Sequence, residues 1–305
     1  KKQAPASLAA ARGMIFALLQ PAGSEVLDIS SDDDLRTEPS AQSSRKRTRS
    51  PRDPAPPPQL RRRLALPGFE PPQSAPTELL LRLGPAFFDE KAHFAALTPS
   101  ASSWLLVLRG LLPPGAARFE SLWAKHPPEL GKAKLFGKEV TFHRYQQSFG
   151  ADYAFSGQVA KGSPLSEDEA PEVWFALAAV RRLLAGAAPP LRDHVYGACL
   201  VNWYDGGQHA IGAHSDDEKG LVPGAPIFAL SWGGPRLFRV IPKDATSGKK
   251  VEFDTADGDL IVMGGTCQQT HKHAVPPCAK QHNRRISLTF RCFRSQQPAN
   301  GAEKK

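Results

Sequence analysis

The segment Arg285-Ile286-Ser287-Leu288-Thr289-Phe290-Arg291 alternates strictly between polar and apolar side chains. Successive side chains of a strand point to opposite faces, so Ile286, Leu288 and Phe290 share one face. Such alternation indicates a strand whose apolar face lies on a hydrophobic core. The segment therefore predicts a β-sheet built from the C-terminal part of the sequence.

The same period of two recurs after Gly197, between clusters of Gly, Asp and Pro that favour turns. The predicted strands span residues 198–204, 227–232, 236–241, 259–263 and 285–293. Upstream of them, residues 167–185 show helical spacing, with acidic residues at the start and Gly186 at the end. Shorter helices are predicted at residues 87–97, 103–112 and 116–123. Helices followed by a run of short strands predict an α+β domain built around a sandwich or jelly roll.

The composition divides the chain into three regions, 1–78, 79–295 and 296–305. The first is rich in Pro, Ser, Ala and charge and has no periodicity, so we expect a disordered tail. The second has the composition of a globular domain, and the third is expected to be a flexible tail. No stretch approaches the roughly 18 apolar residues of a transmembrane helix, so no membrane partner is expected. No Cys-x-x-Cys pair occurs, so we expect the four cysteines to be reduced and mostly buried. We also expect a monomer.

Two short pieces of the tail carry information. Val26, Leu27 and Ile29 are followed by serines and acids, a pattern that resembles a SUMO-interacting motif, which adds a strand to a partner's sheet. Residues 45–63 contain eight basic residues and one acid, Asp53, and the whole chain has a net charge of +9. The basic stretch is either a solvated tail or a signal for nuclear import and phosphate binding, and it favours a nuclear protein.

The sequence His214-Ser215-Asp216 places an imidazole and a carboxylate on one side of an extended segment. With one distant histidine, they would form the two-His, one-carboxylate triad that binds non-haem Fe(II) and leaves open positions. His271 and His273 are both candidates for that third ligand, and spacing alone does not choose between them. Zinc is the competing metal, but sets rich in thiolate or His are more typical of it. His209 and His282 lack such a partner and are predicted to be polar surface residues.

A second cluster predicts an anion site. Arg285, Ser287, Thr289 and Arg291 form the polar face of the C-terminal strand, and buried guanidinium groups are costly unless an anion meets them. Their planar forks suit carboxylates, so a small diacid would fit. The alternative is an outward polar face on an edge strand. Two polar residues that share a face of the strand at 198–204 could complete the pocket, namely Asn202 and Tyr204.

These motifs, taken in order, resemble the AlkB family of oxidative dealkylases over residues 117–293, about three fifths of the chain. The resemblance implies a double-stranded β-helix, a form of jelly roll, with flanking N-terminal helices. It also implies iron bound by His214, Asp216 and His273. His273 is favoured over His271 because it directly precedes the short apolar stretch at 274–276.

The resemblance further implies that Arg291 pairs with the far carboxylate of 2-oxoglutarate. The supporting residues that it implies are Asn202, Tyr204, Arg285 and Thr289. Ser287 departs from the family, many members of which carry Asn there, and this change could loosen the pocket. Trp203 replaces a position that is often basic and is predicted to serve in packing.

Residues 148–157 resemble the family's substrate lid. Tyr153 and Phe155 lie two residues apart and could present rings on one side, where the family stacks a base that has been flipped out of its helix. The alternative is that either ring only packs a hairpin. Asp217 and Glu218 could bind the exocyclic group of the base, since carboxylates suit an amino donor or a cationic lesion.

The resemblance implies oxidative dealkylation of N-alkylated bases in DNA or RNA, with release of aldehyde, succinate and CO2, and thus DNA repair in the nucleus. One alternative keeps the chemistry but takes N6-methyladenine or a protein side chain. Another is a non-enzymatic scaffold that binds nucleic acid or SUMO. The complete ligand set argues against the scaffold, because an inactive site has no reason to keep three ligands and both arginines.

Overall fold

The structure is a computed structural model that describes residues 66, 69, 91–135, 138–155, 158–187, 191–246, 248–280 and 282–297. The chain divides into two compact units, residues 1–64 and 65–305, and every described residue belongs to the second. The SUMO-motif residues Val26, Leu27 and Ile29 and the basic segment 45–63 lie outside the described residues.

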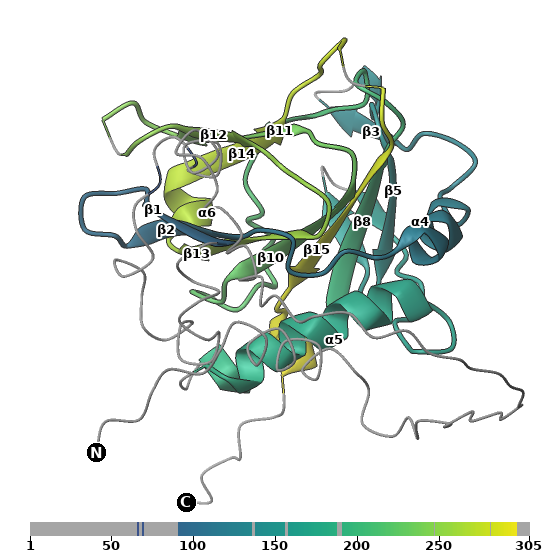
Figure 1. The fold of residues 1–305 in the computed structure, drawn as a ribbon, viewed down its shortest axis with the longest axis horizontal. Coiled ribbons are helices and arrows are strands. Elements are labelled where there is room, and N and C mark those ends of the chain that lie inside the picture. The colour runs from purple at the N-terminus through teal and green to yellow at the C-terminus, as the bar shows by residue number, and fades with distance from the viewer. Residues whose placement is uncertain are drawn as a thin grey trace, which may run out of the picture. The chain divides into compact units, whose positions relative to one another are not determined.

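Two antiparallel sheets form the body of the second unit (Figure 1). The seven-stranded sheet has the order β1-β2-β13-β10-β15-β8-β5, and the four-stranded sheet has the order β12-β11-β14-β9. The strands of the first are Ala92–Ala96 (β1), Ser103–Leu108 (β2), Asp259–Gly265 (β13), Ile227–Gly233 (β10), Arg285–Arg291 (β15), Ala198–Tyr204 (β8) and Tyr145–Phe149 (β5). Those of the second are Val251–Asp254 (β12), Leu237–Pro242 (β11), His271–Val275 (β14) and Ile211–His214 (β9).

From β8 onward the chain crosses repeatedly between the two sheets. β8, β10, β13 and β15 belong to the large sheet, while the strands that follow the first three of them belong to the small one. Side chains from both sheets share one core, including Val107 and Ile261 from the large sheet and Val240 and Phe253 from the small one. This alternation is a jelly roll, the predicted fold.

Five predicted strands are confirmed, because β8, β10, β11, β13 and β15 overlap the stretches 198–204, 227–232, 236–241, 259–263 and 285–293. The helix predicted at 167–185 begins later, as α5 (Pro171–Ala185), and the one at 116–123 is α4 (Ala116–Trp123). The sequence does not predict strands β9, β12 and β14, which are three of the four strands of the small sheet.

The helices predicted at 87–97 and 103–112 are wrong, since these stretches form β1 and β2 within their described parts. All six residues of β2 are buried between β1 and β13. A short run of apolar residues fits a buried strand as well as a buried helix, so periodicity could not distinguish them. Of the N-terminal helices expected to flank the core, only α4 is present in the described part of the chain before α5.

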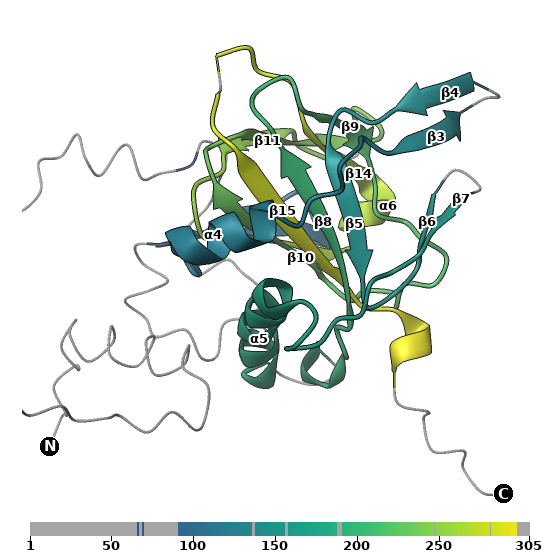
Figure 2. The same ribbon diagram turned by 90° about the vertical axis from the view of Figure 1, so that its right-hand side faces the viewer.

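Helices α4 and α5 lie together beside the large sheet (Figure 2). Trp203 on β8 is fully buried, and its indole N–H donates to the carbonyl of Leu122 in α4. Trp232 on β10 is also fully buried and donates to the carbonyl of Leu112. Because Trp203 and Tyr204 are neighbours on one strand, they face opposite sides, and Tyr204 belongs to the core between the sheets. Trp203 therefore packs on the outer face, as predicted.

Two short hairpins extend from the sheets, β3 (Lys132–Leu135) with β4 (Lys138–Thr141) and β6 (Tyr153–Phe155) with β7 (Gln158–Ala160) (Figure 2). The described residues also form the 3-10 turns η3 (Leu191–Asp193) and η4 (Arg294–Gln296), and the short helix α6 (Cys267–Thr270) precedes β14. None of the described helices has the length and apolar character that crossing a membrane requires.

Two residues of the predicted tail contribute to the core. Leu66 and Phe69 pack against the core between the sheets, and the ring of Phe69 meets that of Phe253 edge-on at 5.5 Å. The tail prediction for 1–78 therefore does not hold at these two positions. All four cysteines are free, and all but Cys278 are buried.

Candidate metal centre and cosubstrate pocket

The three predicted ligands lie together, with one donor atom from each of His214, Asp216 and His273 within 4.8 Å of the others. His214 ends β9 and His273 lies opposite it on β14, and their ring centroids are 4.3 Å apart. Strand pairing thus unites two histidines that are far apart in the sequence. Asp216 reaches the same point from the loop that follows β9.

The donor atoms point inward. His214 Nδ1 lies 2.9 Å from the carbonyl of Gly212, to which its N–H can donate, and this leaves Nε2 as the ligand atom. Asp216 Oδ1 lies 3.6 Å from His214 Nε2 and 4.0 Å from His273 Nε2. The other carboxylate oxygen, Oδ2, is buried and has no hydrogen-bond partner in the described part of the chain.

The charges at the three ligands suit a cation. Burial alone would raise the pKa of Asp216, but the nearby Arg291 and the two histidines outweigh burial and hold that pKa well below its usual range. Burial lowers the pKa of His273 to about 3, with the neighbouring His214 adding to the effect. At neutral pH the set is a carboxylate and a neutral imidazole with a second imidazole beside them. These donors fit Fe(II), which binds two His and one carboxylate on one face.

The remaining histidines play no part in this set. His271 is buried, and its Nδ1 lies 2.7 Å from Thr270 Oγ1 instead of facing the other ligands. His209 is half-buried and accepts a hydrogen bond from the backbone N–H of Asp205, so the prediction of a plain surface residue is wrong there. His282 is exposed, as predicted.

The predicted cosubstrate residues line one cavity that also contains the three metal ligands. Register explains their convergence, because Arg285 pairs with Tyr204 and Ser287 with Asn202 across β15 and β8. The polar face of β15 therefore points inward, and the alternative of an outward edge face is excluded. The cavity's polar lining is Asn202, Tyr204, His214, Asp216, His273, Arg285, Ser287, Thr289 and Arg291.

Arg285 supplies a buried positive charge at one end of this cavity. It is 1% exposed, its Nε donates to Ser231 Oγ at 2.9 Å, and its guanidinium lies 5.1 Å from the ring centre of Tyr204. Its Nη1 is buried and has no hydrogen-bond partner in the described part of the chain. A buried donor left over beside a phenol suits one carboxylate of a diacid.

Arg291 lies at the opposite end, next to the metal ligands. Its Nη2 is 2.8 Å from Asp216 Oδ1, and its Nε is 3.5 Å from Glu218 Oε1. Arg285 and Arg291 are six positions apart on an extended strand, which corresponds to about 20 Å along β15. Arg285 and its strand partner Tyr204 therefore lie at the other end of β15 from Arg291, whose guanidinium contacts the metal ligand Asp216.

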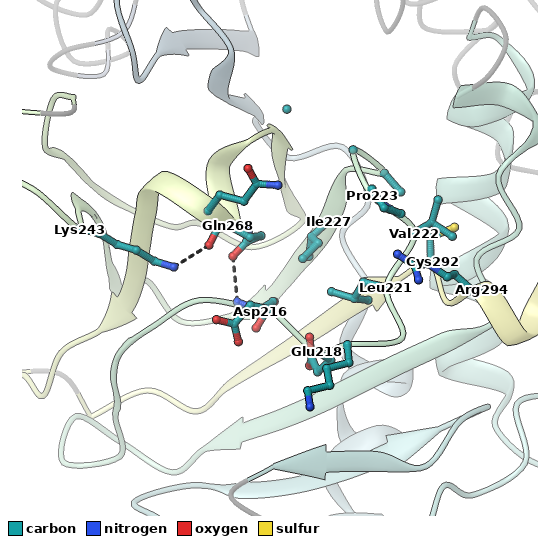
Figure 3. A pocket seen from close by; sticks show the side chains of 16 residues that line it. Asp216, Glu218, Leu221, Val222, Pro223, Ile227, Lys243, Gln268, Cys292 and Arg294 are labelled. Atoms are coloured by element: carbon teal, nitrogen blue, oxygen red, sulfur yellow. Dashed lines mark hydrogen bonds between the residues drawn. The ribbon is translucent and has the colours of Figure 1, made fainter.

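A second cavity of about 390 Å³ opens beside Asp216 (Figure 3). Asp217 and Glu218 line it together with apolar residues of the loop after β9, including Leu221 and Val222. Tyr153 and Phe155 lie on β6, and their side chains are outside the described part of the structure.

Three residues of the site carry no motif that the sequence could reveal. Gln268 and Lys243 line the second cavity, and Gln268 accepts a hydrogen bond from the backbone N–H of Asp216. Arg236 is 1% exposed and binds backbone carbonyls near Tyr204. Its place directly after Gly233-Gly234-Pro235 signals a turn but not burial.

Comparison with known proteins agrees with this geometry. The family model described as "2OG-Fe(II) oxygenase superfamily" matches residues 121–291, which is more than half of the chain. The human protein "DNA oxidative demethylase ALKBH2" is 31% identical over 179 residues, covering 53% of this chain and 61% of that protein. The rat "Alpha-ketoglutarate-dependent dioxygenase alkB homolog 3" is 32% identical over 105 residues, covering 32% of this chain and 36% of that protein.

A viral relative spans a similar part of the chain. The "RNA replication protein" of Grapevine virus A (isolate Is 151) is 32% identical over 174 residues, covering 57% of this chain and 9% of that protein. The chain thus spans at most 61% of the length of these relatives. The family match covers both histidine strands, the carboxylate ligand and the arginine strand. The chain therefore belongs to the 2OG-Fe(II) oxygenase superfamily, and within it the chain is AlkB-like.

Proposed function

We propose that this protein is an Fe(II)- and 2-oxoglutarate-dependent dioxygenase that removes N-alkyl groups from nucleobases, with DNA as the first candidate substrate. The observation that carries the proposal is the convergence of His214, Asp216 and His273 with the buried Arg285 in one cavity. When bound, Fe(II) and 2-oxoglutarate would supply the oxidising chemistry with O2, yielding succinate and CO2, and the oxidised alkyl group would leave the base as an aldehyde.

The residues of the first cavity bind and orient the diacid. Arg285 and Tyr204 bind its far carboxylate, and Asn202, Ser287 and Thr289 line the space between that carboxylate and the metal ligands. Arg291 holds the Asp216 carboxylate, which fixes the orientation of that ligand. The cavity walls exclude bulk water, because its polar residues from β8 and β15 are each less than 10% exposed.

The second cavity receives the base. Asp217 and Glu218 on its wall accept hydrogen bonds from an exocyclic amino group or face a cationic alkylated ring. Burial raises the pKa of Glu218, with Arg291 opposing the shift. Tyr153 and Phe155 on the β6–β7 hairpin stack against the extruded base. The name of the human relative, a DNA oxidative demethylase, supports a nucleic-acid substrate.

A single assay tests the activity. Purified protein with Fe(II), 2-oxoglutarate and O2 is given oligonucleotides carrying 1-methyladenine, N6-methyladenine or no modification, each as DNA and as RNA. We expect succinate and repaired base to form in equal amounts with 1-methyladenine DNA. Turnover only with N6-methyladenine, or only with RNA, would support the proposed reaction but identify a different substrate. RNA is included because the viral relative is named an RNA replication protein.

Removal of one ligand separates catalysis from binding. We expect His214→Ala to abolish turnover, since His214 is a metal ligand. Affinity for the oligonucleotide should stay within about threefold of the wild type, because His214 is not proposed to contact the nucleic acid. His282→Ala, at an exposed histidine, is the matched control and should retain full activity. Turnover that survives in His214→Ala would refute the ligand assignment, and absence of turnover in the wild type on every oligonucleotide would favour the scaffold alternative.

The tail supports two further proposals. Residues 45–63, with eight basic residues, direct the protein to the nucleus, and a fluorescent fusion that lacks them should accumulate there less. Val26, Leu27 and Ile29 bind SUMO, which titration of the peptide 25–34 by NMR would test. An unchanged nuclear signal, or a spectrum without shifts, would remove the respective proposal.

A further inference from the structure

The carboxylate ligand lies where strand pairing no longer holds the backbone. β9 ends at His214, so Asp216 belongs to the loop that follows and has no ladder hydrogen bond. Two polar contacts from residues 268–271 replace that ladder. Asp216 N–H donates to Gln268 Oε1 at 2.9 Å, and Ser215 Oγ donates to the carbonyl of His271 at 2.8 Å.

Gln268 is itself fixed by its neighbours (Figure 3). Its Nε2 lies 3.5 Å from Met263 Sδ, and its backbone carbonyl accepts a hydrogen bond from Lys243 Nζ at 2.9 Å. It belongs to α6, which leads directly into β14, the strand that carries His273. Gln268 therefore links the loop of one metal ligand to the strand of another.

Arg291 holds the carboxylate of Asp216. Arg291 Nη2 lies 2.8 Å from Asp216 Oδ1, and both side chains are at least 96% buried, so their attraction is weakly screened. A separate anchor holds the Asp216 backbone, because the contact with Arg291 is made by the side chain. The side-chain oxygen of Gln268 supplies that anchor, because it accepts the backbone N–H directly.

We propose that Gln268 is a positioning residue that holds Asp216 in register with His214 and His273 for metal binding, through the acceptor oxygen of its amide. The inference concerns the metal centre of the proposed enzyme and not its substrate. Partners that orient metal ligands typically contribute about 10- to 100-fold to metal affinity.

Titration with Co²⁺ under nitrogen, in the absence of 2-oxoglutarate and nucleic acid, tests the proposal. Calorimetry gives the dissociation constant, and the visible absorption of bound Co²⁺ reports its ligand geometry. Gln268→Met keeps the length of the side chain but removes the acceptor, so we expect metal affinity to fall by about tenfold or more, with an altered absorption band. Gln268→Glu retains an acceptor oxygen and should bind Co²⁺ within about threefold of the wild type.

Gln269→Met is the matched control, because Gln269 is exposed and its side chain forms no hydrogen bond within the described residues. Thermal unfolding of each metal-free variant shows whether a substitution merely damages the fold. Wild-type affinity in Gln268→Met, or an equal loss in Gln268→Glu and Gln268→Met, would overturn the proposal. Turnover is not measured here, so an inactive wild type would count against the proposed function and leave this result standing.

Discussion

At the scale of single residues, the two arginines of β15 have separate roles. Arg291 contacts the metal ligand Asp216, whereas Arg285 lies near Tyr204 with one buried N–H donor available. Both side chains are almost fully buried, so each charge acts in a medium that screens it poorly. In the proposed function, Arg285 is therefore the residue that binds the far carboxylate of the diacid.

Arg285→Met tests that assignment. We expect the dissociation constant for 2-oxoglutarate to rise by roughly 10- to 100-fold, because a hydrogen bond to a charged group contributes about 1.5–3 kcal/mol. Co²⁺ affinity should change little. Calorimetry of the metal-loaded protein gives the 2-oxoglutarate affinity, and calorimetry of the metal-free protein gives the Co²⁺ affinity. Arg284→Met is the control, since Arg284 is partly exposed and pairs with Glu120. If Arg291→Met weakens 2-oxoglutarate binding as strongly and leaves metal binding unchanged, the role of Arg291 that the family resemblance implies holds instead.

The sequence predicts which residues form this site, but it does not predict which end of β15 lies next to the metal ligands. Alternation along 285–291 correctly indicates which side chains share the inner face, and the spacing of His214 and Asp216 indicates the ligand pair. It does not indicate which end of the strand meets the metal, because that depends on the loop after β9. Gln268 could not be predicted at all, since its contact joins residues 52 positions apart.

At the scale of elements, a buried arginine ties the two histidine strands to each other. Arg236 donates to the carbonyls of Gly206 and His209, in the turn before β9, and to that of Pro276, just after β14. It forms no salt bridge with an acid within the described residues. Backbone carbonyls thus replace a counter-ion, and the turn is fixed against the strand that carries His273.

Arg236→Met should therefore destabilise the fold. We expect a loss of about 3 kcal/mol in the free energy of unfolding, because several buried carbonyls lose their donor and each such loss costs about 1–3 kcal/mol. Urea unfolding followed by circular dichroism gives the value. Arg236→Lys should fall between the two, since an ammonium reaches fewer of the carbonyls. Wild-type stability in Arg236→Met would show that the carbonyls find other partners.

A second prediction at this scale concerns the contact between α4 and α5. Burial would raise the pKa of Glu172, but hydrogen bonds from Lys125 and Ser121 outweigh burial and hold that pKa below its ordinary value. Since the folded-state pKa is lower than the unfolded one, the carboxylate stabilises the fold above the unfolded pKa. This contribution disappears as the pH falls through the folded-state pKa.

We expect Glu172→Gln to lower the free energy of unfolding at pH 7 by about 1 kcal/mol. The difference from the wild type should shrink steadily as the pH falls below about 4.5, the region of an ordinary glutamate. Urea unfolding at a series of pH values measures it, with Glu167→Gln as the control on an exposed neighbour. A difference that stays constant over this range would mean that charge does not matter at position 172.

The element predictions failed where tertiary contacts decide. Residues 104–108 are apolar throughout, and only the strands on either side make this stretch a strand. β9 and β14 are short and contain glycine or histidines, so their propensity is weak, and pairing across the small sheet stabilises them. The helix α5 was predicted well because its apolar stripe is long and local.

At the scale of the whole molecule, the described unit closes its metal site with residues from both sheets. His214 and His273 come from the small sheet, and Arg285 and Arg291 come from the large one. Binding at this junction therefore stabilises the packing of one sheet on the other.

The melting temperature should respond to ligands in a fixed order. We expect Co²⁺ to raise it by several degrees, since a ligand at 100 times its dissociation constant adds about 2.7 kcal/mol. We expect 2-oxoglutarate to add a further increase only when the metal is present. Scanning calorimetry with and without EDTA measures both effects. The same increase in His214→Ala would place metal binding elsewhere on the chain.

The indole groups of Trp203 and Trp232 have a practical consequence. Trp203 donates to a main-chain oxygen within α4, and Trp232 donates to one in the stretch before it. Detachment of these segments would break both hydrogen bonds and expose the two indole rings to water. Their emission would then move to the red while the sheets stay intact. The protein thus carries an intrinsic optical probe for the docking of its outer layer, separate from unfolding of its interior.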